Sequence, residues 1–85
     1  GVISVLSNVA PRQTVAVYEA FQRGELATSA RLHAALLPVT QYLFAEVNPV
    51  PVKAMMADMG LCRNELRLPL APGTLPNESL IRDLA

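Results

Sequence analysis

The chain has 85 residues, a formal net charge of zero and 52% hydrophobic residues. A neutral chain has no overall field to attract nucleic acid or an anionic membrane, and its seven basic residues are scattered without interleaved aromatic side chains. Its apolar runs are far shorter than the ~20 residues that cross a bilayer. We therefore expect no nucleic-acid partner and no membrane span.

Two further features concern the origin of the chain. Cys62 is the only cysteine, which excludes an internal disulfide and fits a reducing, cytoplasmic compartment. The first residues contain no initiator Met, basic leader or signal-peptide cleavage pattern. High apolar content in a short, neutral chain is typical of a slice of a larger core. We expect the chain to begin within a longer protein.

The first element that the sequence predicts is a strand over residues 2–5. Val2-Ile3-Ser4-Val5 is a β-branched run typical of a strand buried in a parallel sheet. No other segment has this character, and parallel neighbours need long crossover connections. The strand's partners must therefore lie before residue 1 or on another molecule. In isolation, the chain should self-associate or leave its first residues disordered.

Helices are expected to follow. Ser7 or Asn8 can cap a helix with Pro11 in its first turn and an end at Gly24. Its apolar positions are Val15, Tyr18, Ala20 and Phe21. A longer helix should open near Glu25 and bend at Pro38, because proline lacks an N–H and clashes with the preceding turn.

The remaining elements are a third helix, a connector and a short last helix. Asn48-Pro49 begins the third helix, and Gly60 is placed to end it. Residues 61–76 contain three prolines and a glycine, which indicates an irregular connector. Asn77 should cap the last helix. The fold class is thus mostly α, with one strand and about four helices.

The most informative motifs are Asn48-Pro49-Val50-Pro51-Val52-Lys53 and, further along, Arg67-Leu68-Pro69-Leu70 with Pro72. Together they resemble the C-terminal signature of the dihydrodipicolinate synthase family, which are pyruvate-dependent class I aldolases. The opening residues Gly1-Val2-Ile3-Ser4-Val5 and Ser7-Asn8-Val9-Ala10 extend the resemblance over the whole chain.

This resemblance implies a fold and a division of the chain. The family builds a (β/α)8 barrel, the TIM barrel, which needs ~250 residues before any appendage. Residues 1–24 would supply the last barrel strand and helix, and residues 25–85 the C-terminal helical appendage. The chain would therefore be roughly the final third of the enzyme.

Lys53 is the only lysine, and pyruvate-dependent aldolases act through a lysine Schiff base. The resemblance nevertheless places the Schiff-base lysine, its tyrosine partner and the carboxylate-binding arginine before residue 1. Lys53 matches the lysine of the Asn-Pro-x-Pro-Val-Lys helix, where it could pair with Glu46. We expect a structural lysine and no catalytic residue in this chain.

The candidate substrate-binding residue is Ile3. It matches an isoleucine on the eighth strand of the family's barrel, and that isoleucine lines the pyruvate pocket. An equally good interpretation is that Ile3 is simply part of the barrel core. Leu6, Ser7 and Asn8 would fall on the catalytic rim, at the C-terminal end of the strand. Many family members have threonine at the position of Leu6, which leaves room for a different substrate.

Other reactive residue types give weaker signals. His33 has no further metal ligand at suitable spacing, so we expect no metal and no cofactor. Cys62 lies beside Arg63 without a nearby histidine and is best interpreted as inert. Arg67 matches a recurrent arginine of the family's connector and is expected to clamp helix carbonyls or carboxylates such as Glu46 or Asp58.

The resemblance implies a parent lyase that condenses pyruvate with L-aspartate 4-semialdehyde, in lysine and diaminopimelate biosynthesis, as a homo-oligomer. The fragment by itself should be inactive. Sister aldolases, such as N-acetylneuraminate lyase or a 2-keto-3-deoxy sugar acid aldolase, are an alternative. A third possibility is a non-catalytic helical module that associates through its apolar faces.

Overall fold

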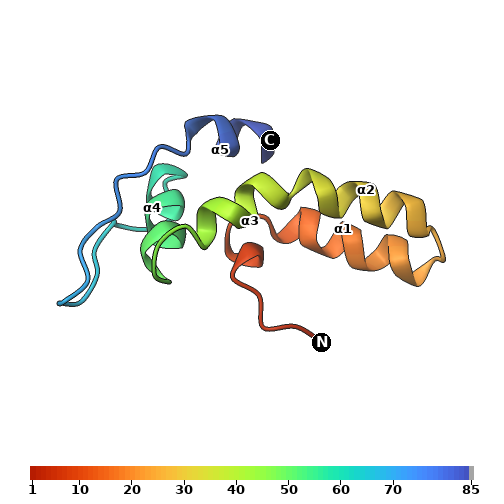
Figure 1. The fold of residues 1–85 in the computed structure, drawn as a ribbon, viewed down its shortest axis with the longest axis horizontal. Helices are drawn as coiled ribbons and strands as arrows, with labels where there is room; N and C mark the ends of the chain where they lie inside the picture. Colours follow the sequence, from red (N-terminus) through yellow and green to blue (C-terminus); the bar gives the residue numbers. More distant parts are fainter. Residues whose placement is uncertain (85) are drawn as a thin grey trace.

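The computed structural model describes residues 1–84, and within this range it is entirely helical (Figure 1). A short 3₁₀-helix precedes five α-helices: η1 (Leu6–Asn8), α1 (Pro11–Gln22), α2 (Leu26–Ala35), α3 (Leu37–Leu43), α4 (Val50–Asp58) and α5 (Glu78–Leu84). Helices α1 and α2 form a hairpin at one end of an elongated molecule of 45 × 26 × 20 Å. Helices α4 and α5 lie at the other end, with α3 between.

The expected strand over residues 2–5 is not formed. Residues 1–4 have no regular secondary structure, and the N-terminus projects away from the helices (Figure 1). Val2 and Ile3 are exposed, whereas Val5 and Leu6 already pack against the core. A parallel strand needs a neighbour to accept its hydrogen bonds, and residues 1–84 contain no other strand. The prediction of a strand was therefore wrong for this chain.

The hairpin of α1 and α2 depends on Gly24. Gly24 has φ 77°, and its N–H donates to Phe21 O at 3.0 Å while the Glu25 N–H donates to Ala20 O at 2.9 Å. These two bonds form a Schellman motif, which ends α1 where the sequence predicted. The buried Ser29 hydroxyl donates to Val17 O at 2.9 Å and joins the two helices.

Pro38 was expected to bend one long helix, but the chain forms two separate helices at this point. Helix α2 ends at Ala35, and the Leu36 N–H donates to His33 O, three residues back, at 3.0 Å. Helix α3 then starts at Leu37 with Pro38 in its first turn, where a missing N–H costs nothing. One predicted helix therefore becomes two, which accounts for five helices rather than four.

Helix α4 and the connector agree with the sequence. Gly60 has φ 82°, its N–H donates to Ala57 O at 2.9 Å, and the Leu61 N–H donates to Met56 O at 2.9 Å. These two bonds form a second Schellman motif, which ends the helix. Residues 61–77 contain no helix or strand and form a long excursion in Figure 1. Asn64 holds the two arms of this excursion together by donating to Gly73 O at 3.3 Å.

Two expected helix caps were wrong. Ser7 and Asn8 bond back to the tail instead of capping α1: the Ser7 hydroxyl donates to Ser4 O and the Asn8 amide to Val5 O. Helix α1 has no side-chain cap. Asn77 does precede α5, but its side-chain amide donates to the Tyr42 hydroxyl at 3.0 Å and its Oδ1 accepts no hydrogen bond within residues 1–84.

The core joins η1, α3 and α4. Its buried members come from the residues between η1 and α1, the α2–α3 junction, α3 itself and α4, and they are Val9, Ala10, Leu36, Val39, Tyr42, Leu43, Val52 and Met55. Leu80, Ile81 and Leu84 of α5 pack against this cluster from outside. Within residues 1–84, no helix is long and apolar enough to cross a bilayer.

Candidate functional site

Ile3, the residue expected to bind substrate, lies on the projecting tail. Its relative accessibility is 106%, so nothing within residues 1–84 covers its side chain. The expected rim residues Leu6, Ser7 and Asn8 form η1 instead of a strand end. The structure therefore brings no polar side chain from another element to Ile3, and a substrate pocket there needs atoms from outside these residues.

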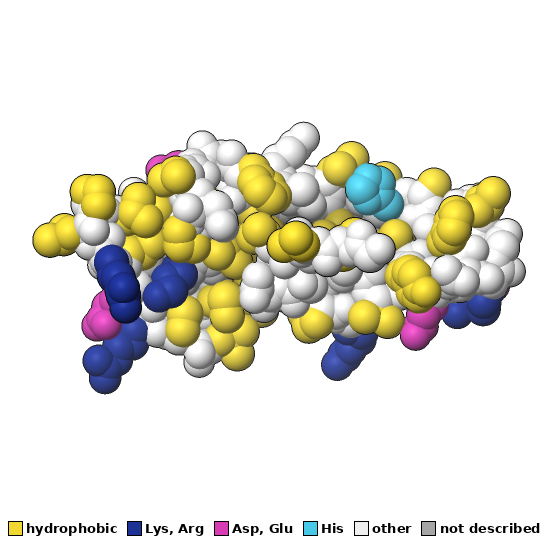
Figure 2. Space-filling model, turned by 90° about the horizontal axis from the view of Figure 1, so that it is seen from below, with side chains coloured by type: hydrophobic (Ala, Val, Ile, Leu, Met, Phe, Trp, Pro, Cys, Tyr) yellow, Lys and Arg dark blue, Asp and Glu magenta, His cyan; other side chains and the backbone are white. Residues whose placement is uncertain are grey.

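The outward face of α1 is apolar as well. Val15, Tyr18 and Phe21 follow one another at three-residue spacing, which places them in a row on the helix, and each exposes more than half of its surface. Tyr18 is 63% exposed and Phe21 is 59% exposed. Figure 2 shows hydrophobic side chains spread along the face of the molecule seen from below. Ala20, on the opposite side of α1, is buried under α2.

The two sequence motifs meet in space. Pro49 and Lys53 of the first motif and Arg67 and Leu70 of the second line one cavity of about 300 Å³, together with Leu66. The Lys53 ammonium donates to Glu65 O of the connector at 2.8 Å. The expected pairing of Lys53 with Glu46 and the expected clamp by Arg67 are absent from the hydrogen bonds and ion pairs of residues 1–84.

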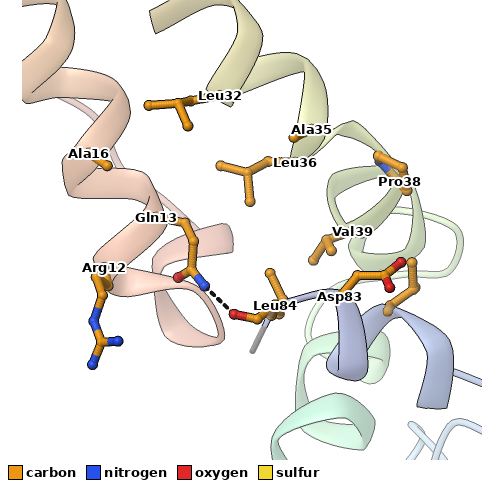
Figure 3. Close-up of a pocket in the computed structure, with 11 residues that line it drawn as sticks. Arg12, Gln13, Ala16, Leu32, Ala35, Leu36, Pro38, Val39, Asp83 and Leu84 are labelled. Carbon is orange, nitrogen blue, oxygen red and sulfur yellow. Dashed lines mark hydrogen bonds between the residues drawn. The ribbon is translucent and has the colours of Figure 1, made fainter. Parts of the chain in front are cut away.

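A second cavity, of about 310 Å³, lies between α1, α2, α3 and α5 (Figure 3). Leu32, Leu36 and Val39 supply much of its apolar lining. Gln13 closes one side by donating to Leu84 O across 71 positions of sequence. In Figure 3 the Arg12 guanidinium points away from the cavity, and Gln13 and Asp83 are the other polar side chains among its lining residues.

The remaining reactive residue types do not assemble into a centre. Within residues 1–84, no group of three or more histidine, cysteine or acidic side chains could hold a metal ion. Cys62 is exposed, and its thiol donates weakly to Lys53 O at 3.9 Å. Arg23 donates to Glu25 at 3.2 Å in the α1–α2 turn, and this hydrogen bond raises the pKa of Arg23 above its ordinary value.

The sequence analysis missed two groupings of residues. It treated the two cations separately, Lys53 as a partner of Glu46 and Arg67 as a clamp to helix carbonyls or carboxylates, whereas both line the same cavity. The sequence did contain a signal for this shared cavity, because each of the two residues belongs to one of the two most informative motifs. The buried pair of Tyr42 and Asn77 was also missed, because residues 35 positions apart give no local signal.

An apolar helix face and a tail without a strand partner are typical of a segment that packs against further polypeptide. Residues 1–84 match the family model described as the dihydrodipicolinate synthetase family. The chain belongs to that family.

Individual relatives agree. A 4-hydroxy-tetrahydrodipicolinate synthase from Pelobacter propionicus is 51% identical over 72 residues, which cover 85% of this chain and 25% of the relative. The enzyme of the same name from Nitratidesulfovibrio vulgaris is 48% identical over 84 residues, which cover 99% of this chain and 29% of the relative. The chain thus spans less than a third of the length of these relatives.

Solved structures support the arrangement of the helices. Dihydrodipicolinate synthase from Thermotoga maritima superposes with a TM-score of 0.87 at 46% identity, over 99% of this chain and 28% of that structure. A structure described as the first monomeric dihydrodipicolinate synthase variant gives a TM-score of 0.88 at 49% identity, over the same shares of the two chains. The helices correspond to a C-terminal part of these enzymes.

Proposed function

We propose that this chain is the C-terminal part of a cytoplasmic lyase that condenses pyruvate with L-aspartate 4-semialdehyde through a lysine Schiff base. The observation that carries the proposal is the family match over residues 1–84, combined with a coverage of only 28–29% of the relatives. The Schiff-base lysine is supplied by the part of the enzyme that this chain does not contain. The fragment by itself is inactive.

In this proposal residues 1–24 complete the barrel and residues 25–85 form the appendage. The tail would become the last strand once a neighbouring strand accepts its hydrogen bonds, and α1 would turn its apolar row, Val15, Tyr18 and Phe21, towards the rest of the enzyme. Their exposure supports this arrangement, because an exposed apolar row normally marks a surface that another segment covers.

Ile3 would line the pyruvate pocket. An isoleucine side chain has no acid or base, so its role is to shape the pocket and exclude water from the Schiff base. Its complete exposure in the fragment is consistent with a pocket whose other walls come from missing strands. The complete enzyme would be a homo-oligomer, and exposed apolar side chains outside the tail and α1, such as Leu61 and Leu68, are available for subunit contacts.

The test is complementation followed by trapping. The chain is co-expressed with the Nitratidesulfovibrio vulgaris enzyme truncated before its matching segment, and the mixture is treated with pyruvate and borohydride. We expect one reduced pyruvate adduct on the truncated partner, shown by intact mass, only when both polypeptides are present. Condensation with L-aspartate 4-semialdehyde, compared with cleavage of N-acetylneuraminate, then identifies the substrate class.

Two variants make the result interpretable. Ile3→Asp should abolish the restored adduct without changing the helical content of the chain, because it places a charge in the proposed pocket. Lys53→Gln should leave the adduct intact, since the reactive lysine is on the partner. A pyruvate adduct on the isolated chain that disappears in Lys53→Gln would overturn the proposal.

A further inference from the structure

The cavity at the two motifs has an unusual combination of walls. Three of its lining residues are apolar, Pro49, Leu66 and Leu70, and the other two are the cations Lys53 and Arg67. No carboxylate is among the residues that line it. Its volume of about 300 Å³ is at the lower end of the range for small-ligand pockets.

Lys53 is held in place at this cavity. Its ammonium donates to Glu65 O at 2.8 Å, and its side chain is half-buried. A lysine ammonium has three N–H donors, so the bond to Glu65 leaves donors for a further acceptor. The hydrogen bond restrains the long side chain, which reduces the conformational entropy that ligand binding would cost.

Arg67 supplies the second cation. Within residues 1–84 its guanidinium takes part in no side-chain hydrogen bond or ion pair, so the guanidinium fork is available. Its backbone carbonyl accepts from the Leu70 N–H at 3.0 Å, which fixes the connector locally. The nearest carboxylate in sequence, Glu65, instead lies 3.8 Å from Arg63 in an exposed pair. Two positive side chains around one cavity repel each other, and an anion between them would remove that repulsion.

We propose that this cavity binds a small organic anion, a carboxylate on a short apolar body. Arg67 donates two parallel N–H bonds to the carboxylate in bidentate geometry, and Lys53 contributes a point charge. Leu66, Leu70 and Pro49 contact the apolar part of the ligand. An inorganic anion would satisfy the two cations but would leave the apolar walls unused, so the combination selects for a ligand with both parts.

The experiment follows backbone amide NMR shifts of the 85-residue chain during titration with hexanoate. We expect saturable shifts confined to residues around 49–53 and 66–70. Hexanamide, the neutral counterpart, should bind at least about tenfold more weakly, since a charged hydrogen bond contributes about that factor. Sulfate, an inorganic anion, should also bind at least about tenfold more weakly, because it buries no methylene groups against the apolar walls.

Variants assign the effect to the cavity. Arg67→Gln should weaken hexanoate at least about tenfold, and Arg31→Gln, which removes an exposed arginine of α2 outside the cavity, should leave the affinity unchanged. Because the Arg67 side chain is exposed and makes no hydrogen bond or ion pair within residues 1–84, its variant should keep the parent spectrum. Equal binding of hexanoate and hexanamide, equal binding of sulfate, or an unchanged affinity in Arg67→Gln would each overturn the proposal.

Discussion

The two ends of this chain differ in how they bury their apolar residues. In α3 and α4, Leu43 and Met55 expose none of their surface. On the tail and α1, Ile3 is fully exposed, and Tyr18 and Phe21 are more than half exposed. The hydrophobic effect scales with the area removed from water, so Leu43 and Met55 stabilise the fold, whereas the exposed surface of Ile3, Tyr18 and Phe21 contributes little. The comparison separates side chains that are buried within residues 1–84 from apolar side chains that stay exposed to solvent.

The sharpest test of this comparison is truncation of one residue in each region. Leu43→Ala or Met55→Ala should lower the free energy of unfolding by about 2–5 kcal/mol, because each removes buried methylene groups and leaves a cavity. Ile3→Ala removes a similar side chain from an exposed site and should change the free energy by less than about 0.5 kcal/mol. Urea unfolding monitored by circular dichroism measures both. Equal losses in the two regions would remove the distinction.

A polar bridge to the connector extends the self-contained region. The Tyr42 hydroxyl donates to Leu75 O at 3.1 Å and accepts from the buried Asn77 amide at 3.0 Å. Tyr42→Phe should cost about 1–3 kcal/mol of unfolding free energy, because it leaves the Asn77 amide and Leu75 O without their partner. The matched change Tyr18→Phe, at an exposed tyrosine of α1, should cost almost nothing. Thermal unfolding of the two variants, measured side by side, tests the bridge. An unchanged stability in Tyr42→Phe would show that α5 and the connector do not depend on it.

The same division explains what could be predicted from the sequence. Helix ends at Gly24 and Gly60 were predicted correctly, because a glycine with positive φ is a local requirement of the turn itself. The break at Pro38 was also local. The prediction of a strand over residues 2–5 was wrong because a strand needs a neighbouring strand to bond with, and residues 1–84 form no other strand. The prediction that Asn77 caps α5 was wrong because the Asn77 side chain donates instead to the hydroxyl of Tyr42, which is distant in sequence.

The candidate sites follow the same rule. The motif residues Lys53 and Arg67 were noticed individually, yet their common cavity depends on how the connector returns to α4, which no local pattern encodes. Ile3 was identified through a resemblance and not through its surroundings. Its proposed role therefore rests on walls that other segments of the enzyme would supply, and it stays a prediction until complementation tests it.

The smallest expected effect on stability comes from the exposed row of α1. Replacing Tyr18 and Phe21 together by lysine should change the free energy of unfolding by less than about 0.5 kcal/mol, since both side chains are largely solvated already. Lysine is a good helix former, and near the C-terminus of α1 its charge also interacts favourably with the helix dipole. The variant should instead reduce self-association of the chain, measured by sedimentation velocity over a range of concentrations.

The matched control for that variant keeps the apolar area. Exchanging the two residues, Tyr18→Phe with Phe21→Tyr, preserves two aromatic rings on the same face and should associate like the parent chain. If the lysine variant also associates like the parent, the row on α1 is not the contact surface and the tail becomes the next segment to test. If it becomes monomeric with its helices intact, the apolar surface of this region contributes to association and not to folding, which is the property expected of a segment that another part of the enzyme normally covers.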